Sequence, residues 1–562
     1  MRWRHLDKSL FVWVLLIGVL LVLVVNPLAR LLWASFEHGA TGAFTLENYA
    51  AAYGRWRYLE ALWNSLVLGL AVAVLGTVFG VPMAWAVSRT DMPAKGLVWA
   101  AILGTFIVPS YLGAVAWILL AGPNAGWLNR LYVWLTGAAS GPLNIYSMAG
   151  LVLVIACYSF PYAFVFTRSA LDLISSEMED AASTLGAGTL RTMLRVTLPL
   201  TLPAILGAFI VEFLEAIALF GAPALIALPA RFQVMTTMLW QFFEFPPKVQ
   251  VAAAYSMPLL AITVFLFWLQ RRIIARKGYV ALTGKGGERR QIRLGGWRWV
   301  MLGYCLFVTS LSFFLPMLVV LQAAFAKAWG RGFGLDNITL ENLRFVLIDQ
   351  PITRAATLHT FVYGGTAAAI ALGLGLSIAY IVHRRLVPLG GALAYIAMAP
   401  FVIPGIVLAI GFYAAYTTPP LVLYGGAWIL ILAFTTRFLP IAYANSDAAI
   451  RSLNPELEDA VRILGGGRLL AMRRVVGPLL KRGLAGAFIL VFIPATRELS
   501  SAIFLYTTGT QVLSVLLFDK SDEGNFEILS SIGLILVVIT VALVLAGFRL
   551  AGRDFMLKRT AS

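Results

Sequence analysis

The sequence predicts an all-α polytopic membrane protein of about 12 transmembrane helices, arranged as two parallel repeats of six spans. Three observations support this fold class. The AVILMFWYC residues make up 60% of the 562 residues and charged residues only 12%, which is about half the charged share of a soluble domain. Apolar runs long enough to cross a bilayer recur along the whole chain. Short motifs of the first half also return in the second half at nearly constant spacing.

Six apolar runs in each half reach the roughly 20 residues that a spanning helix needs. The first six spans are expected near 10–33, 62–88, 97–121, 147–169, 202–227 and 251–270. The second six are expected near 299–325, 358–382, 391–416, 421–444, 481–505 and 528–549. The first run is too long for a secretory signal and lacks a small-residue cleavage site, so we interpret it as an uncleaved span.

A basic segment separates the two series of spans. Residues 271–298 contain nine Lys or Arg residues and one acidic residue, Glu288. Membrane topology explains this charge, with an anionic-lipid site as the alternative. The predicted domains are a first half at 1–270 with its core at 61–270, a linker at 271–298, and a second half at 299–562 with its core at 358–549.

The basic residues also predict orientation. Lys and Arg collect in cytoplasmic loops, and most of the 43 in this chain do so when the N-terminus is cytoplasmic. The inverted topology would place the whole 271–298 cluster outside. We therefore expect both termini and the linker on the cytoplasmic side of a bacterial inner membrane. The formal charge of +17 then reflects topology in a lipid bilayer, and no nucleic-acid partner is expected.

Internal repeats predict that the two halves have the same fold and the same orientation. FTLENYA at 44–50 matches ITLENLR at 338–344, and VPMAWAVSR at 81–89 aligns with LSIAYIVHR at 376–384. FIVPS (106–110) likewise aligns with FVIPG (401–405). A duplicated unit with an even number of spans keeps its orientation, so the repeats are expected to be parallel.

The strongest signal is a polar cytoplasmic loop that occurs twice, at 175–205 and 454–484. Each copy is expected to form a short helix with acidic residues in its first turn, followed by a glycine that takes a positive φ and ends the helix. Two matched loops on one face indicate one partner surface each. The residues predicted to form these surfaces are Glu179, Asp180, Ala181, Ala182 and Gly186 in the first copy and Glu458, Asp459, Ala460 and Gly465 in the second.

These loops resemble the EAA loop of ABC importer permeases of the type I importer fold. The first copy reads DAASTLG (180–186) with Leu198-Pro199, and the second reads DAVRILG (459–465) with Gly477-Pro478. The departures are Asp for Glu in both copies, Val461 for the second Ala, and Gly477 for Leu. The resemblance implies that each loop inserts into a cytoplasmic ATP-binding subunit, so that one chain recruits a homodimer of these subunits.

Within this family, fused double permeases are typical of ferric-iron importers. The stretches 492–519 and 212–223 resemble the ferric group, which implies ferric iron or a ferric complex as substrate. Thiamine, polyamine and phosphonate are the alternatives within the family. The external segments are too short to form a ligand-binding domain, so a separate periplasmic or lipid-anchored binding protein is expected to deliver the substrate.

Other chemistry has little support in the sequence. YVALTGKGG (279–287) lacks the first glycine of a phosphate-binding loop and the Ser or Thr after its lysine, so ATP hydrolysis is expected on a separate subunit and the chain is not expected to be an enzyme. The two cysteines and four histidines are scattered, so neither a metal site nor a cofactor is expected. A proton-coupled secondary transporter and a membrane enzyme are the rival classes; neither explains the paired loops.

Charged residues at membrane depth are candidates for function because burying them is costly. Glu212 and Glu215 lie three residues apart in the fifth span and share a helix face. Arg497 and Glu498 are expected near the external end of the eleventh span. We predict that the three carboxylates contact the substrate transiently or act as gate charges, with Arg497 balancing one of them. An interhelical ion pair is the equally weighted alternative.

Overall fold

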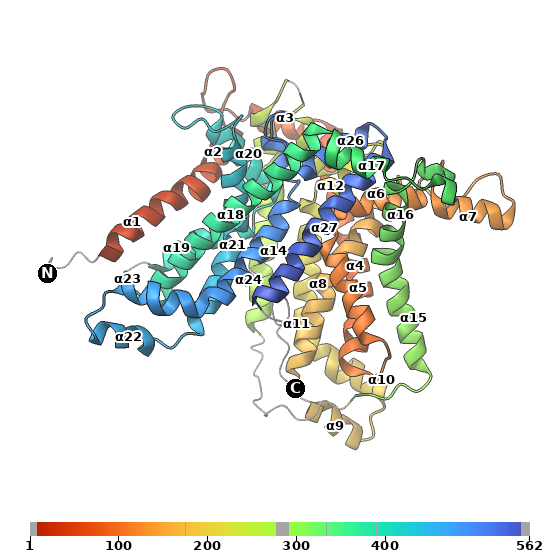
Figure 1. Ribbon diagram of the computed structural model, residues 1–562, viewed down its shortest axis with the longest axis horizontal. Helices are drawn as coiled ribbons and strands as arrows, with labels where there is room; N and C mark the ends of the chain where they lie inside the picture. The colour runs from red at the N-terminus through yellow and green to blue at the C-terminus, as the bar shows by residue number, and fades with distance from the viewer. Residues whose placement is uncertain are drawn as a thin grey trace.

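The computed structural model describes residues 8–551 except 175, 245, 277–290, 333 and 388–389. This part of the chain folds into helices, with isolated β-bridges as its only extended pairing. Ten of its helices are long and apolar enough to cross a membrane, or up to 12 spans if each of two bent helix pairs counts as one. The predicted all-α polytopic fold is confirmed, and Figure 1 shows its two bundles of steeply inclined helices.

The first half runs from α1 to α14. Its helices are α1 (Lys8–Leu20), η1 (Leu21–Val25), α2 (Asn26–Ser35), α3 (Glu47–Tyr53), α4 (Trp56–Arg89), α5 (Lys95–Ile107), α6 (Ser110–Ala121), α7 (Trp127–Thr136), α8 (Met148–Leu173), α9 (Ser176–Thr184), α10 (Thr189–Thr192), η2 (Met193–Thr197), α11 (Leu198–Ala218), α12 (Gly221–Ile226), α13 (Met235–Gln241) and α14 (Val249–Arg276).

The second half repeats this order. Its helices are α15 (Trp297–Thr309), η3 (Ser310–Phe314), α16 (Leu315–Ala324), η4 (Trp329–Arg331), η5 (Leu335–Asn337), α17 (Glu341–Arg344), η6 (Phe345–Asp349), α18 (Pro351–His383), α19 (Gly390–Met398), η7 (Ala399–Phe401), α20 (Gly405–Tyr416), α21 (Ala427–Arg451), α22 (Glu456–Ile463), α23 (Arg468–Ala471), η8 (Met472–Val476), α24 (Gly477–Thr496), α25 (Ala502–Leu505), α26 (Leu513–Asp522) and α27 (Phe526–Ala551).

The third predicted span of each half is a bent pair instead of one continuous helix. The pair α5 and α6 bends by 104°, and Gly390–Phe401 with α20 bends by 111°. Both bends fall at the repeated proline motif, with Pro109 and Pro404 as the N-caps of α6 and α20. A residue before proline is disfavoured from the helical region, and Val108 is extended at φ −74°, ψ 127°. Hydropathy alone could not reveal these bends.

The fifth span of each half ends earlier than the apolar run predicted. Helix α11 ends at Ala218 and α24 at Thr496, whereas the runs extended to 227 and 505. Beyond these ends the chain forms the short helices α12 and α25, which are fully buried. Irregular backbone at membrane depth is tolerated where protein surrounds it. These apolar residues therefore fill the space between the halves and do not extend the spans.

The opening helices of the two halves are exchanged. Helices α1 and α2 pack against α19 and α20 of the second half, and α15 and α16 pack against α5 and α6 of the first. Small residues allow this close approach: a Cβ at Gly411 would lie 2.7 Å from the Pro27 carbonyl oxygen, and one at Gly104 would lie 2.5 Å from the Phe313 ring. The halves consequently interlock around one core.

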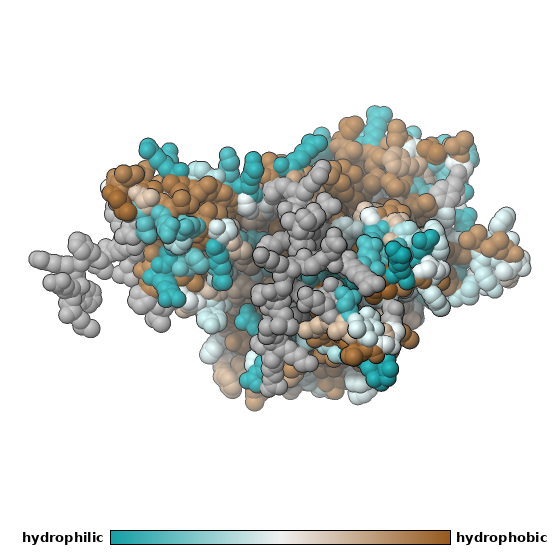
Figure 2. Space-filling view, turned by 90° about the horizontal axis from the view of Figure 1, so that it is seen from below, coloured by the Kyte–Doolittle hydropathy of each residue, from teal (hydrophilic) through white to brown (hydrophobic). Residues whose placement is uncertain are grey.

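Apolar side chains cover the outer surface of the helices. Trp63, Phe265 and Phe307 are each more than half exposed on α4, α14 and α15. Figure 2 shows the molecule from below, with hydrophobic residues over its flanks and hydrophilic residues in separate groups. An apolar surface of this extent on long helices fits a lipid environment.

Candidate functional site

The two predicted loops lie on the lower side of the molecule in Figure 1. We call residues 176–205 the first loop and residues 454–484 the second loop. In each, a short helix (α9 or α22) is followed by a turn, a second short helix and a π-helical segment that leads into α11 or α24. The helix–turn–helix expected from sequence is confirmed in both copies.

Glycine ends the first helix of each loop. Gly186 has φ +82° and Gly465 has φ +80°, a conformation that L-residues with a side chain adopt at a cost. The amide of Ala187 donates to the carbonyl of Ala182 at 3.0 Å, and the amide of Gly466 donates to that of Val461 at 2.8 Å. These are the closing hydrogen bonds of a Schellman motif. The predicted positive φ is confirmed at both glycines.

Each loop is held by an arginine–glutamate contact to a long helix from earlier in its half, α4 or α18. Arg384, at the end of α18, donates from Nε and Nη2 to Glu458 Oε1 at 2.9 and 2.6 Å, and Tyr380 donates to Glu458 Oε2 at 2.8 Å. In the first half, Arg89 lies 3.8 Å from Glu179, which also accepts from Thr197 at 2.8 Å. Glu179 and Glu458 therefore anchor their loops to the helices that cross the membrane.

Apolar side chains project from both loops into solvent. Leu185 is 89% exposed and Leu464, at the matching position, is 88% exposed. Ala181 and Ala460 are also exposed, one turn earlier on α9 and α22. An almost fully exposed leucine therefore occupies the same position of the short polar loop in both halves.

The described part of the linker contacts the end of α4, beside the first loop. Its residue Ile292 forms a parallel bridge with Thr90, and its amide donates to the Arg89 carbonyl at 2.8 Å. Asp91 Oδ1 accepts from the amide of Leu294 at 2.9 Å. We call linker residues 291–294 the strap. A space of about 750 Å³ lies between the strap and the first loop, and Glu179 and Asp180 are among its lining residues.

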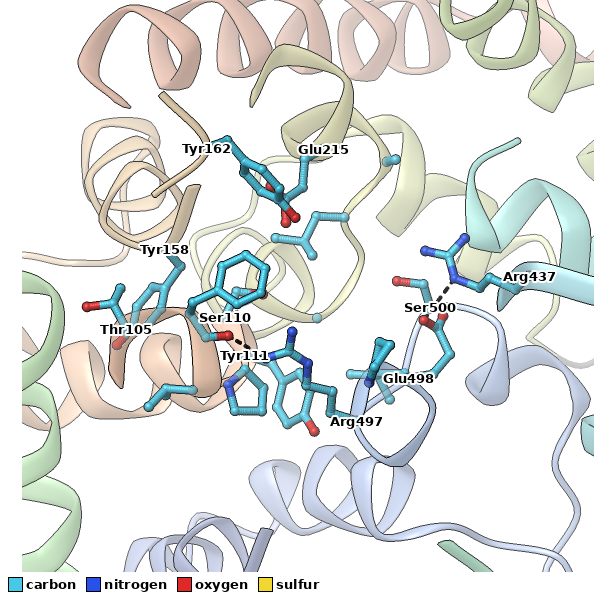
Figure 3. Close-up of a pocket in the computed structure, with 18 of the residues that line it drawn as sticks. Thr105, Ser110, Tyr111, Tyr158, Tyr162, Glu215, Arg437, Arg497, Glu498 and Ser500 are labelled. Atoms are coloured by element: carbon cyan, nitrogen blue, oxygen red, sulfur yellow. Dashed lines mark hydrogen bonds and ion pairs between the residues drawn. The ribbon is translucent and has the colours of Figure 1, made fainter. Parts of the chain in front are cut away.

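A polar cavity lies between the two halves, beside the bend at Pro109. Its volume is about 280 Å³, and Figure 3 shows the side chains around it. Tyr158 and Tyr162 come from the middle of α8, and Arg437 comes from the interior of α21. Substrate sites of duplicated transporters lie at such a repeat interface near the bilayer midplane. The cavity is the candidate translocation site.

Three of the four predicted path residues line this cavity: Glu215, Arg497 and Glu498. Arg497 and Glu498 directly follow the end of α24 and lie beside the middle of α8 and α21. They thus lie at the end of α24 that is farther from the second loop, and this end is reached earlier in the chain than the apolar run predicted.

The charge balance within the cavity also differs from the prediction. Glu498 pairs with Arg437, whose Nε donates to Glu498 Oε2 at 2.9 Å. Arg497 instead donates from Nη1 to the carbonyls of Phe106 and Ile107 at 2.8 and 3.0 Å. Sequence reasoning missed Arg437, although a single arginine inside an apolar run is a signal for function in a membrane protein.

Glu212 and Glu215 both lie beside α8, but they have different surroundings. Glu212 is fully buried and accepts from the amide of Ala163 and the hydroxyl of Thr77, each at 3.3 Å. Its carboxylate occupies space left by Gly76, where a Cβ would lie 2.8 Å from Glu212 Oε2. Glu215 lines the cavity near Tyr162, and its Oε2 has no hydrogen-bond partner among the described residues. The structure therefore does not bring Glu212 into the cavity.

Comparison with known proteins identifies the architecture. The family model for the inner membrane component of binding-protein-dependent transport systems matches twice, at residues 76–279 and 371–553. The chain is 25% identical to a ferric transport system permease of Actinobacillus pleuropneumoniae over 93% of its length and 75% of that protein, and 25% identical to a putative one of Haemophilus influenzae over 88% and 77%. It is 26% identical to a putative 2-aminoethylphosphonate transport permease of Salmonella paratyphi A, over 43% of this chain and 90% of that protein.

Each of the two matches includes one loop and one bent helix pair, so they account for the duplication of both features. They also place the protein in a bacterial inner membrane as a multi-pass subunit that works with ATP-binding and substrate-binding components. The chain belongs to the family of binding-protein-dependent ABC importer permeases, as a fused double permease with both permease repeats in one polypeptide.

Proposed function

We propose that this permease imports ferric iron into the cytoplasm. The observation that carries the proposal is the similarity to ferric permeases over nearly the whole chain, both repeats included. Among the described residues no group of three His, Cys, Asp or Glu side chains could hold a metal ion, which suits a path that must release what it binds.

Each loop docks one copy of a cytoplasmic ATP-binding subunit, so a homodimer of ATPases, which carries out the ATP hydrolysis, serves this single chain. The matched anchors Glu179 and Glu458 and the matched exposed leucines support this assignment. Asp180, Ala181, Ala182 and Gly186, with Asp459, Ala460 and Gly465, complete the two docking surfaces. Both termini and the 271–298 linker then lie in the cytoplasm, as the basic residues predict.

A periplasmic or lipid-anchored binding protein delivers the substrate on the opposite side. The domain division into 1–270, 271–298 and 299–562 follows from the same topology. Glu215, Arg497 and Glu498 act on the substrate as it crosses, whereas Glu212 contributes to packing of α11 on α4 and α8. Arg437 joins the path residues as the partner of Glu498.

The test is ⁵⁵Fe uptake into proteoliposomes that hold the permease with its ATP-binding subunit, supplied with iron-loaded binding protein. Uptake and ATP hydrolysis are measured separately for the wild type and for Glu215→Gln combined with Glu498→Gln. We expect the double variant to lose at least tenfold in uptake while its ATPase remains stimulated by the binding protein. Absence of iron uptake in the wild type would refute the ferric substrate, and unchanged uptake in the double variant would refute the path.

A 2-aminoethylphosphonate substrate is the second candidate, because the Salmonella relative matches one repeat's length of this chain. The same vesicles distinguish the two: 2-aminoethylphosphonate should neither enter nor compete with ⁵⁵Fe. Accumulation of the labelled phosphonate in place of iron would transfer the proposal to that substrate class.

A further inference from the structure

The charges around the cavity do not form two matched pairs. Arg437 and Glu498 neutralise one another in a contact of 2.9 Å. Glu215 and Arg497 remain, and neither forms an ion pair with a described residue: Glu215 Oε2 is unpartnered, and Arg497 is bound to backbone carbonyls. In Figure 3 Glu215 lies on one side of the cavity with Tyr162, and Arg497 lies on the other. The cavity therefore presents a carboxylate and a guanidinium from different walls.

Such a cavity is poorly suited to a bare trivalent cation. A cation that approached Glu215 would also meet the unpaired charge of Arg497 and the terminal nitrogens of Arg437, in surroundings where charges interact more strongly than in water. A guanidinium is instead well shaped for carboxylate or phosphate oxygens. The arrangement fits a ligand that carries an oxyanion beside a cationic centre.

We propose that iron passes this cavity while still bound to an oxyanion, with the oxyanion against Arg497 and the metal side of the complex against Glu215. This inference rests on the proposed ferric substrate and adds the chemical class of its ligand, a phosphate or a polycarboxylate. The volume of about 280 Å³ is roughly nine times the share of one water molecule in the liquid. It therefore has room for a metal ion with a small polyatomic ligand.

The test counts the anion that accompanies each iron. Proteoliposomes with the complete transporter and binding protein receive ⁵⁵Fe with [³²P]phosphate in one arm and ⁵⁵Fe with [¹⁴C]citrate in the other. We expect ATP-dependent entry of one of the labelled anions in fixed proportion to iron, and the arm in which it occurs identifies the anion. Iron entry with neither anion would overturn the inference while leaving the ferric substrate intact. Absence of iron entry in both arms would overturn the proposed function itself.

Variants at Arg497 test where the anion is held. Arg497→Gln should lower co-transport of iron and anion together by at least tenfold, whereas Arg497→Lys, which keeps the charge, should retain the anion-to-iron ratio at a reduced rate. Arg130→Gln on the exposed helix α7 is the matched control and should leave both labels unchanged. If Arg497→Gln transports iron at the wild-type rate, with or without the labelled anion, Arg497 does not hold an oxyanion.

Discussion

Equivalent positions of the two repeats carry the same residues in the anchors of the two loops but different residues in the cavity. In the loops, Glu179 matches Glu458, and the arginines that contact them, Arg89 and Arg384, occupy equivalent positions at the ends of α4 and α18. In the cavity the repeats differ: the position of Arg437 is held by Tyr158 in the first half, and that of Glu215 by Pro494 in the second. The two loops are therefore symmetric in chemistry, and the cavity is not.

The proposed function accounts for this difference. On that proposal, two copies of one ATP-binding subunit require two similar docking surfaces, so a departure in either loop would weaken one of two equal contacts. A single cavity between the halves would hold one substrate at a time, and its walls would need only one carboxylate and one guanidinium. Asymmetric charge would then belong to the proposed path, and symmetric anchoring to the proposed coupling to ATP hydrolysis.

The largest effect is expected from removal of the second anchor. Glu458→Ala leaves Arg384 and Tyr380, both largely buried, without their shared acceptor, and breaking a buried pair costs about 3–5 kcal/mol. Binding-protein-stimulated ATPase activity and co-purification of the ATP-binding subunit should both fall by at least tenfold. Glu179→Ala should cost less, because Arg89 keeps its bonds to the carbonyls of Leu171 and Ile174.

The exposed Glu456, on the same helix as Glu458, provides the control, and Glu456→Ala should retain wild-type activity. Equal losses for Glu179→Ala and Glu458→Ala would show that the two anchors are interchangeable. That result would contradict the difference in geometry between them.

The next effect concerns the glycines that end α9 and α22. Valine at Gly186 or Gly465 must adopt a positive φ, at a cost of about 1–2 kcal/mol. If the loop relaxes to avoid this cost, stimulated ATPase activity should fall roughly 5- to 30-fold. Either single variant should be as severe as the other.

Gly188→Ala and Gly467→Ala are matched controls, because a Cβ at either position meets nothing within 4 Å and neither φ is positive. Membrane insertion, followed by the yield of folded protein in detergent, should be unchanged in all four variants. A lower yield for Gly186→Val would assign the glycine to folding of the whole chain.

A smaller effect should separate the first loop from the second. Asp91→Ala removes the hydrogen bond from the Leu294 amide, which is worth about 0.5–1.5 kcal/mol. Amide hydrogen exchange near Ile292 should increase, and stimulated ATPase activity should change no more than about threefold. Asp349→Ala, at an exposed ion pair with Arg344, is the control. Faster exchange in the second loop would mean that the strap acts on both loops.

The sequence could predict the loops more completely than the cavity, for a physical reason. Each loop is a local structure, so its cap, helix and glycine appear in order within about 30 residues and appear twice. The cavity is assembled from distant segments. Arg437 and Glu498 are separated by 61 positions, and no local pattern pairs them.

Hydropathy does not predict the ends of α11 and α24, for a related reason. The apolar residues after Ala218 and Thr496 resemble the continuation of a span, but the chain leaves the helix there and packs between the halves. The bends at Pro109 and Pro404 did have a local signal in the repeated proline. Each apolar run was long enough for one continuous span, so the proline was not interpreted as a bend.

The smallest effect is expected at Glu212, and it tests whether this residue lies outside the translocation path. Glutamine at this position keeps an oxygen that can accept from the Ala163 amide, and its NH2 group can donate to the Thr77 hydroxyl once that hydroxyl rotates to accept. The space beside Gly76 accommodates its similar size. Glu212→Gln should therefore change ⁵⁵Fe uptake by less than about twofold, whereas Glu215→Gln, three residues away, should reduce it strongly. Both variants are compared at equal stimulated ATPase activity, so that folding and coupling do not enter the ratio. A loss of uptake in Glu212→Gln as large as that in Glu215→Gln would extend the translocation path along α11 to the packed interface with α4 and α8, and the asymmetric cavity would then be only one part of it.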